Sequence, residues 1–294
     1  MTEICSVCPR GCGINRKEQR GYCGEGDSVR LARAALHFWE EPCVSGRNGS
    51  GTVFFSGCNL RCVYCQNKEI SRGRIGKEVS LERLEEIFFE LKAQGAHNIN
   101  LVTPTHFAEQ IKIAVKAAKA DGLELPVVWN TGGYETAETI RDLNETVDVY
   151  LTDFKYMSGE LAFKYSFAGD YPEAAKRALC EMVKTKGKPV FDENGLIKRG
   201  VIVRHLVLPG HTDDSLRVLD YLYDTYGDDI IISIMSQYTP TDITKYTELN
   251  RKLTRYEYNK VIAGAEKLGI KNAYVQDGAA AKESFIPDFD YSGV

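Results

Sequence analysis

Residues 52–65, TVFFSGCNLRCVYC, join a short apolar run to three closely spaced cysteines. The run TVFF (52–55) is typical of a buried strand, and the Ser-Gly pair after it indicates a turn. Cys58, Cys62 and Cys65 then follow in a Cx3Cx2C pattern, with no fourth cysteine nearby. Structural zinc takes four protein ligands, whereas an iron–sulfur cluster is held by cysteine thiolates at its iron corners. The spacing therefore predicts a cluster with one iron open to an outside ligand.

Strand-like and helix-like segments alternate from about residue 50 onward. The expected strands cover residues 52–55, 98–102, 126–130, 148–152, 201–208, 229–235 and 273–276. Amphipathic helical segments lie between them, among them 80–95, 106–122 and 253–269. Such alternation calls for parallel strands joined by right-handed crossovers. The sequence therefore predicts an α/β fold, namely a partial (β/α)6-type barrel of parallel strands, with an open doubly wound sheet as the alternative.

The N-terminal part of the chain does not follow this alternation. We expect residues 1–48 to form a cysteine-rich cap and residues 49–294 to form the barrel. The glycine-rich stretch SGRNGSG (45–51) is expected to be a flexible joint between the two.

Four cysteines of the cap form a second group with the spacing Cx2Cx3Cx10C. They are Cys5, Cys8, Cys12 and Cys23. Four soft ligands suit either structural zinc or a second, fully ligated iron–sulfur cluster, and both alternatives stay open. Cys43 is an alternative ligand for this group, and His37 near it is either a ligand or a packing residue. Cys180 lies in a helical pattern and is expected to be a buried, small apolar residue.

Composition excludes several classes of protein. The 294-residue chain has a formal charge of −4, so no basic surplus indicates a nucleic-acid partner. No apolar run approaches the length of a membrane span, and the polar N-terminus is unlike a signal peptide. We therefore expect a cytoplasmic protein, in which nine cysteines favour metal binding over disulfides.

The loop CNLRCVYC (58–65) resembles the signature loop of the radical S-adenosylmethionine (radical SAM) enzymes, Cx3CxΦC, with Tyr64 as the aromatic residue. Residues from about 50 to 280 are similar to the branch that contains the pyruvate formate-lyase activating enzymes and their uncharacterised homologues. The resemblance implies that Cys58, Cys62 and Cys65 hold a [4Fe-4S] cluster whose fourth iron is chelated by S-adenosylmethionine. It also implies that Tyr64 lies near the adenine.

Further site residues follow from weaker matches. DVYLTDFKYM resembles the strand that supplies an aspartate and a lysine toward the cosubstrate, here Asp153 and Lys155. VRHLVLPGHTDD resembles the next strand and turn, which places Arg204 near the ribose or the carboxylate. Many members of the family have a Gly-Gly-Glu stretch after the second strand, where this chain has LVTPTHF. Thr103, Thr105 and His106 are therefore expected to replace its hydrogen bonds to the methionyl ammonium.

Two more strand ends carry polar groups. NTGGYE (130–135) either contributes Asn130 to the cosubstrate pocket or is only a βα turn, and both interpretations stay open. Gln237 and Tyr238 fall at the end of a later strand, where side chains line the pocket of such barrels.

The resemblance implies reductive cleavage of S-adenosylmethionine to methionine and a 5′-deoxyadenosyl radical, with a flavodoxin or ferredoxin as electron donor. In the activases this radical takes a hydrogen atom from a glycine of a partner enzyme. A radical SAM enzyme that modifies a peptide or a small molecule is the first alternative. The second is a non-catalytic iron–sulfur electron-transfer protein, and the open iron of the three-cysteine loop favours an enzyme over it.

Overall fold

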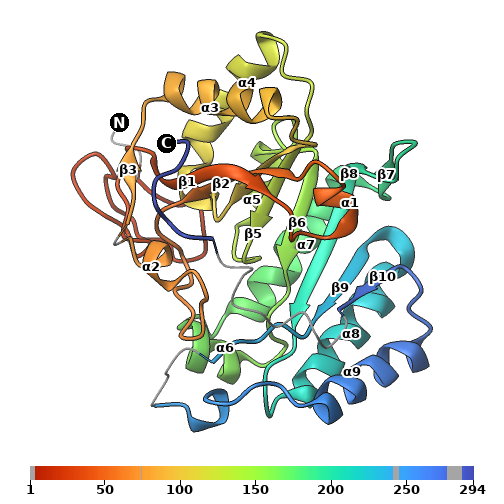
Figure 1. Ribbon diagram of the computed structural model, residues 1–294. Coiled ribbons are helices and arrows are strands. Elements are labelled where there is room, and N and C mark those ends of the chain that lie inside the picture. The colour runs from red at the N-terminus through yellow and green to blue at the C-terminus, as the bar shows by residue number, and fades with distance from the viewer. Residues whose placement is uncertain (1–3, 74, 241–244, 277–286) are drawn as a thin grey trace.

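The computed structural model describes residues 4–73, 75–240, 245–276 and 287–294. Its centre is one sheet with the strand order β10-β9-β8-β6-β5-β4-β2-β1-β3 (Figure 1). The strands are β1 (Arg30–His37), β2 (Ser50–Phe55), β3 (Lys77–Glu78), β4 (Ile99–Val102), β5 (Val127–Thr131), β6 (Val149–Asp153), β7 (Val190–Phe191), β8 (Ile197–Leu206), β9 (Ile231–Met235) and β10 (Ala273–Val275).

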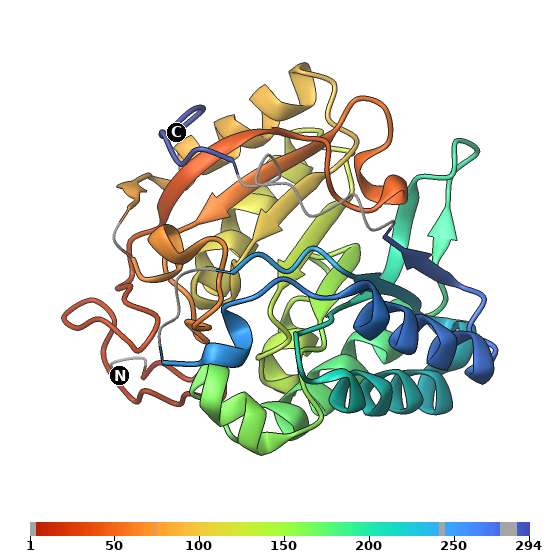
Figure 2. The same ribbon diagram turned by 60° about the horizontal axis from the view of Figure 1, so that its bottom comes forward.

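Neighbouring strands from β2 to β10 along this sheet are parallel, which confirms the predicted fold class. The α-helices are α1 (Pro42–Ser45), α2 (Lys68–Ser71), α3 (Leu81–Ala93), α4 (Ala108–Ala120), α5 (Ala137–Asp142), α6 (Gly159–Ser166), α7 (Tyr171–Lys186), α8 (Thr212–Tyr226) and α9 (Arg255–Leu268). The larger helices pack along one face of the curved sheet, as in a partial (β/α) barrel (Figures 1 and 2).

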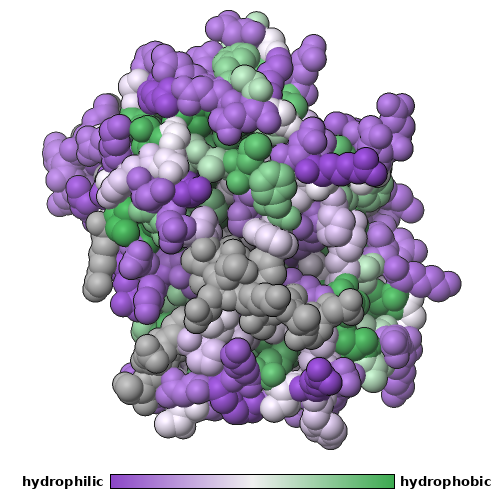
Figure 3. Space-filling model, in the orientation of Figure 1, coloured by the Kyte–Doolittle hydropathy of each residue, from purple (hydrophilic) through white to green (hydrophobic). Residues whose placement is uncertain are grey.

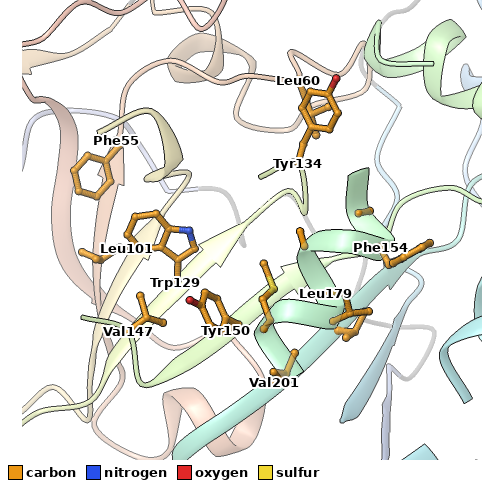
Figure 4. Close-up of a cluster of buried hydrophobic side chains, with 14 of the residues drawn as sticks. Phe55, Leu60, Leu101, Trp129, Tyr134, Val147, Tyr150, Phe154, Leu179 and Val201 are labelled. Atoms are coloured by element: carbon orange, nitrogen blue, oxygen red, sulfur yellow. The ribbon is translucent and has the colours of Figure 1, made fainter. Parts of the chain in front are cut away.

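Alternate residues of the strands supply two separate cores, because successive side chains in a strand point to opposite faces. Toward the helices, β2, β4, β5 and β6 contribute Phe55, Leu101, Trp129 and Tyr150, all buried (Figure 4). On the inner face of the barrel, a smaller core joins residues of β5, β6, β8 and β9 to Cys43 and Val44 of α1. Helix α1 therefore fills part of the barrel interior.

The N-terminal region contributes to the same sheet. Strand β1, which lies within residues 1–48, pairs antiparallel with β2. The stretch 45–51 holds the end of α1 and the start of β2, and its Ser45 and Ser50 are buried. The C-terminal residues run beside β1, where Tyr291 N donates to Ala32 O at 3.1 Å (Figure 1).

Cys43, the alternative ligand of the N-terminal cysteine group, is buried among the apolar residues of the inner core. The prediction for the other single cysteine is wrong. Cys180 is exposed on α7 rather than buried. Its position in a helical pattern was compatible with either face, and the helix turns it outward.

Candidate active site

A cavity of about 530 Å³ lies at the carboxyl ends of the parallel strands. This volume is within the roughly 300–1,000 Å³ typical of small-molecule sites. The expected site residues that line the cavity are Cys58, Cys62, Tyr64, Cys65, Thr103, Asn130, Asp153, Lys155, Arg204 and Gln237. They come from loops and strands spread over most of the chain. The fold thus gathers these side chains at one place.

The three-cysteine loop begins at Gly57, directly after β2. Gly57 has a φ of +85°, and a Cβ there would lie 2.8 Å from Cys23 O, so glycine alone suits this turn. Burial, together with the charges of the other two loop thiols, raises the pKa of the Cys65 thiol to about 12. Ser166 Oγ donates to Cys62 Sγ at 2.9 Å.

These three thiols fit a cluster with an open corner. Each of them lines the cavity, and the structure places no fourth cysteine among the residues that line it. Thiols with raised pKa values, here those of Cys62 and Cys65, become thiolates on binding a cation, because the metal charge replaces the lost hydration. The donor set and its open side therefore match a [4Fe-4S] cluster that also binds a small molecule.

Asp153 and Lys155 form a partly buried ion pair in the cavity wall at the end of β6. Lys155 Nζ lies 2.5 Å from Asp153 Oδ2. Burial alone would lower the pKa of Lys155, but the charges of Asp153 and Cys62 raise it well above its usual value. Lys155 therefore stays protonated and brings a positive charge to the thiols.

Arg204, on β8, is held by two glutamates that the sequence analysis missed. Its Nε donates to Glu41 Oε1 at 2.8 Å, and it also pairs with Glu40. Glu40 Oε1 accepts from Asn100 Nδ2 at 2.9 Å and from Asn130 Nδ2 at 3.2 Å. Both glutamates line the cavity, so the segment after β1 brings two carboxylates to its wall.

Thr105 does not line the cavity, unlike Thr103. Its hydroxyl donates to Glu135 Oε1 at 2.6 Å, and the Thr131 hydroxyl donates to the same oxygen. Burial raises the pKa of Glu135, whose Oε2 finds no partner among the described residues. Thr105 and Glu135 thus form a buried network behind the cavity wall.

The aromatic position of the loop is also anchored. Tyr64 is buried, and its hydroxyl lies 2.6 Å from that of Tyr156. Gln237 is at the edge of the cavity, where its carbonyl accepts from Gln66 Nε2 at 3.0 Å. Together these contacts fix the loop against the strand ends on the opposite side.

A family model described as the Radical SAM superfamily matches residues 52–222, which is more than half of the chain. The chain belongs to the radical SAM superfamily. Among its relatives, an uncharacterised protein of Methanocaldococcus jannaschii, MJ0674, is 31% identical over 279 residues, covering 92% of this chain and 76% of that protein. The pyruvate formate-lyase-activating enzyme of Clostridium pasteurianum is 25% identical over 224 residues, covering 70% of this chain and 82% of that enzyme.

Similarity to solved structures is more remote. The Streptococcus suis protein SuiB bound to its precursor peptide SuiA aligns with a TM-score of 0.48 and 12% identity, over 75% of this chain and 46% of that one. Membership of the radical SAM superfamily implies a [4Fe-4S] cluster and S-adenosylmethionine as cofactors, and the cavity described above suits both.

The N-terminal cysteines lie outside this radical SAM cavity. They follow one another along a loop that packs beside the three-cysteine loop, next to α6 (Figure 2). Cys8 and Cys23 are buried, whereas Cys5 and Cys12 are partly exposed. Within the residues that the structure describes, every helix is too short or too polar to cross a membrane.

The glutamates that sequence reasoning missed had one available signal. Glu40 and Glu41 form the acidic pair in HFWEEPC, directly before a proline. Adjacent carboxylates in an otherwise apolar stretch indicate a buried cation nearby, but the pattern does not tell which one.

Proposed function

We propose that this chain cleaves S-adenosylmethionine reductively at a [4Fe-4S] cluster on Cys58, Cys62 and Cys65, and that the product radical takes a hydrogen atom from a glycine of a partner protein. The observation that carries the first part is the convergence of three thiols, a lysine and an arginine on one cavity. The second part rests on the similarity to a pyruvate formate-lyase-activating enzyme.

When bound, the reduced cluster supplies the electron that splits a carbon–sulfur bond of S-adenosylmethionine. The side chains of this chain have other tasks. Lys155 places a positive charge beside the thiols and favours the anionic cluster. Asp153 and Arg204, each held by a salt bridge, give the cavity a fixed polar wall.

Glu40 and Glu41 are suited to the methionyl ammonium. The stretch LVTPTHF carries no acidic residue at the end of β4. In the cavity wall, however, two carboxylates form salt bridges with the same arginine. One carboxylate is sufficient to pair with Arg204, so the second can accept hydrogen bonds from an ammonium. In this proposal Thr103 and Asn130 add polar contacts beside it, Tyr64 and Gln237 border the adenine, and Thr105 supports the wall from behind.

The rim of the cavity suits a protein or peptide substrate. Phe38 and Trp39 line the cavity and are 50% and 58% exposed. On the face shown in Figure 3, hydrophobic side chains form small groups among hydrophilic ones. Exposed aromatic side chains are enriched where proteins bind partners. The proposed substrate is a partner protein, and an enzyme that modifies a peptide or a small molecule is the alternative. The proposed electron donor is a flavodoxin or ferredoxin in the cytoplasm.

The first experiment tests the chemistry. The protein is reconstituted anaerobically with iron and sulfide, reduced with dithionite and given S-adenosylmethionine, and 5′-deoxyadenosine and methionine are followed by mass spectrometry. We expect both products from the wild type and neither from the variant with Cys58, Cys62 and Cys65 changed to alanine. A reduced, cluster-loaded wild type without cleavage would favour the non-catalytic electron-transfer alternative.

The second experiment tests the substrate. A glycyl-radical-type partner enzyme with deuterated glycine is added, and deuterium in 5′-deoxyadenosine is measured together with the radical signal by electron paramagnetic resonance. Deuterium transfer and a radical on the partner would support an activase. Cleavage without transfer from any such partner would favour a peptide or small-molecule substrate.

A further inference from the structure

We propose that Cys5, Cys8, Cys12 and Cys23 hold a second iron–sulfur cluster, ligated by all four thiolates, which passes electrons from an acidic protein donor to the cluster on Cys58, Cys62 and Cys65. This relay rests on the proposed function, because its electron acceptor is the cluster proposed there. The metal site itself stands on the geometry of the N-terminal loop.

A short hairpin brings the first three thiols together. Ile4 and Asn15 form an antiparallel bridge. Cys5 N donates to Ile14 O at 2.9 Å, and Gly13 N donates to Cys5 O at 3.2 Å. The hairpin therefore returns Cys12 to the side of Cys5, with Cys8 at the turn between them.

The fourth thiol reaches the same place through a glycine. A Cβ on Gly21 would lie 3.5 Å from Cys12 Sγ and 3.5 Å from Cys23 Sγ, so the missing side chain leaves room between these two sulfurs.

The spacing of these thiols favours a cluster over zinc. Zinc–sulfur bonds of about 2.3 Å in a tetrahedron bring all four sulfurs to within roughly 4 Å of one another. Across the described residues, no three His, Cys, Asp or Glu side chains are close enough together to hold a single ion. That finding covers the N-terminal thiols and the three thiols of the radical SAM loop alike. The same result for both sets is what an iron–sulfur cube requires, because such a cube is larger than one ion and is held by thiolates.

The two cysteine groups are joined by the backbone. Cys58 N donates to Cys23 O at 3.2 Å, so the last cysteine of one group is hydrogen-bonded to the first cysteine of the other. Electron tunnelling between metal centres weakens steeply with distance, and a path through a few covalent bonds and one hydrogen bond is short. This contact places the N-terminal group where it can deliver an electron.

Arg10 fastens the N-terminal loop in this position. Its Nε donates to Asn59 O at 2.8 Å, and its other nitrogens donate to Phe167 O at 2.5 Å and Ser166 O at 3.1 Å. Its guanidinium also lies over the ring of Tyr22, 3.9 Å from the centroid. A loop held by one arginine to both the three-cysteine loop and the end of α6 keeps a fixed distance between the two groups.

The surface of the loop suits an acidic donor. Arg10, Arg16, Lys17 and Arg20 lie in residues 4–24, where Glu18 is the acidic residue, although the whole chain is formally −4. Lys17 and Arg20 are exposed, and Cys5 and Cys12 are partly exposed beside them. Complementary charge speeds the encounter of a carrier with its docking site. A reduced flavodoxin or ferredoxin would lose one electron here, and the relay makes and breaks no bond.

The test begins with iron content. Wild type, a Cys8→Ala/Cys12→Ala variant, a Cys58→Ala/Cys62→Ala/Cys65→Ala variant and a Cys180→Ala control are reconstituted anaerobically, and iron, sulfide and zinc are counted per chain. We expect about eight irons in the wild type and the control and about four in each cluster variant. One zinc in place of the second cluster, or full iron in the Cys8→Ala/Cys12→Ala variant, would overturn the proposal.

The triple-alanine variant keeps the test independent of folding in the N-terminal variant. In it the remaining iron should give the Mössbauer and electron paramagnetic resonance spectra of a [4Fe-4S] cluster, reducible by flavodoxin. If that cluster is present but the wild type cleaves no S-adenosylmethionine, the proposed function fails and the second site stands. Wild type that cleaves S-adenosylmethionine with only about four irons would refute the second site alone.

The relay is tested by changing the reductant. Cleavage by the Cys8→Ala/Cys12→Ala variant is compared with wild type, once with dithionite and once with reduced flavodoxin. We expect the loss with flavodoxin to exceed the loss with dithionite by about tenfold or more. Equal losses with both reductants would show that electrons do not enter through the N-terminal cysteines.

Discussion

The two cysteine groups of this chain touch each other, but their surroundings differ. The thiols of Cys58, Cys62 and Cys65 line a cavity that is large enough for a small molecule. The N-terminal thiols lie outside it, three of them in a hairpin and the fourth, Cys23, in the segment that follows it. Three thiols beside a cavity leave a coordination position for a substrate, whereas four thiols in their own loop leave none. The comparison therefore predicts that S-adenosylmethionine is cleaved at the first group and that the second group only transfers electrons to it.

The largest expected effect separates the groups by activity. Cys65→Ala should lower dithionite-driven cleavage of S-adenosylmethionine by roughly 10³-fold or more, because an incomplete thiol set no longer presents the open iron. Cys23→Ala should lower it far less, and Cys180→Ser, on the exposed face of α7, should be close to wild type. Initial rates of 5′-deoxyadenosine formation check this. Comparable losses for Cys65→Ala and Cys23→Ala would remove the distinction between the groups.

The next effect concerns the segment that leads from the N-terminal loop into the cavity. Arg204→Met leaves Glu40 and Glu41 buried without their cation, which should lower the free energy of unfolding by about 3–5 kcal/mol. Urea unfolding under anaerobic conditions measures it. Arg33→Met is the matched control, since its partner Asp290 is largely exposed and the loss should be about 1 kcal/mol or less.

A second variant tests the cause of that loss. Adding Glu41→Gln to Arg204→Met removes one of the two uncompensated charges, so part of the stability should return. No recovery would indicate that Arg204 stabilises the wall through packing of its long side chain rather than through charge.

The strands and the cysteine loop of this site can be predicted from the sequence, but the glutamates that complete its wall cannot. The parallel strands and the cysteine loop follow from local patterns, because buried β-branched runs and turn residues act over a few positions. Strand β1, RLARAALH, was missed because its apolar and polar residues do not alternate in the regular way that indicates a strand. The contact of Glu40 with Arg204 spans 164 positions and depends on β1 pairing with β2, so no local pattern contains it.

A smaller effect should come from the turn that lets the two groups touch. Gly57→Ala adds a Cβ that would lie 2.5 Å from Glu25 Cγ and 2.8 Å from Cys23 O, at a φ of +85°. We expect a loss of about 3 kcal/mol, combining backbone strain with overlap. Gly122→Ala is the matched control, since φ is +93° there but nothing lies within 4 Å. The free energy of unfolding of this control should fall by about 1 kcal/mol. Equal losses in the two variants would mean that the chain around Gly57 can move apart to admit a Cβ.

The smallest effect is a pH dependence at the junction of the two groups. His106 lies there, with its Nε2 2.5 Å from Ser56 O and its carbonyl accepting from Arg16 of the N-terminal loop. Burial lowers the pKa of His106 to about 3, whereas in the unfolded chain it is about 6.5. As the pH falls below about 6.5 the unfolded state takes up a proton that the folded state refuses until about pH 3, so stability is lost over that window.

At pH 5 the protonation of His106 in the unfolded chain lowers the free energy of unfolding by about 2 kcal/mol, and at pH 7.5 this loss is absent. His106→Gln keeps a donor for Ser56 O but does not titrate, so its unfolding free energy should fall less between pH 7.5 and pH 5 than that of wild type, by about that amount. Urea unfolding at both pH values measures the difference. An identical acid dependence in the variant would mean that His106 takes up its proton in the folded state, and that the junction between the cysteine groups admits water.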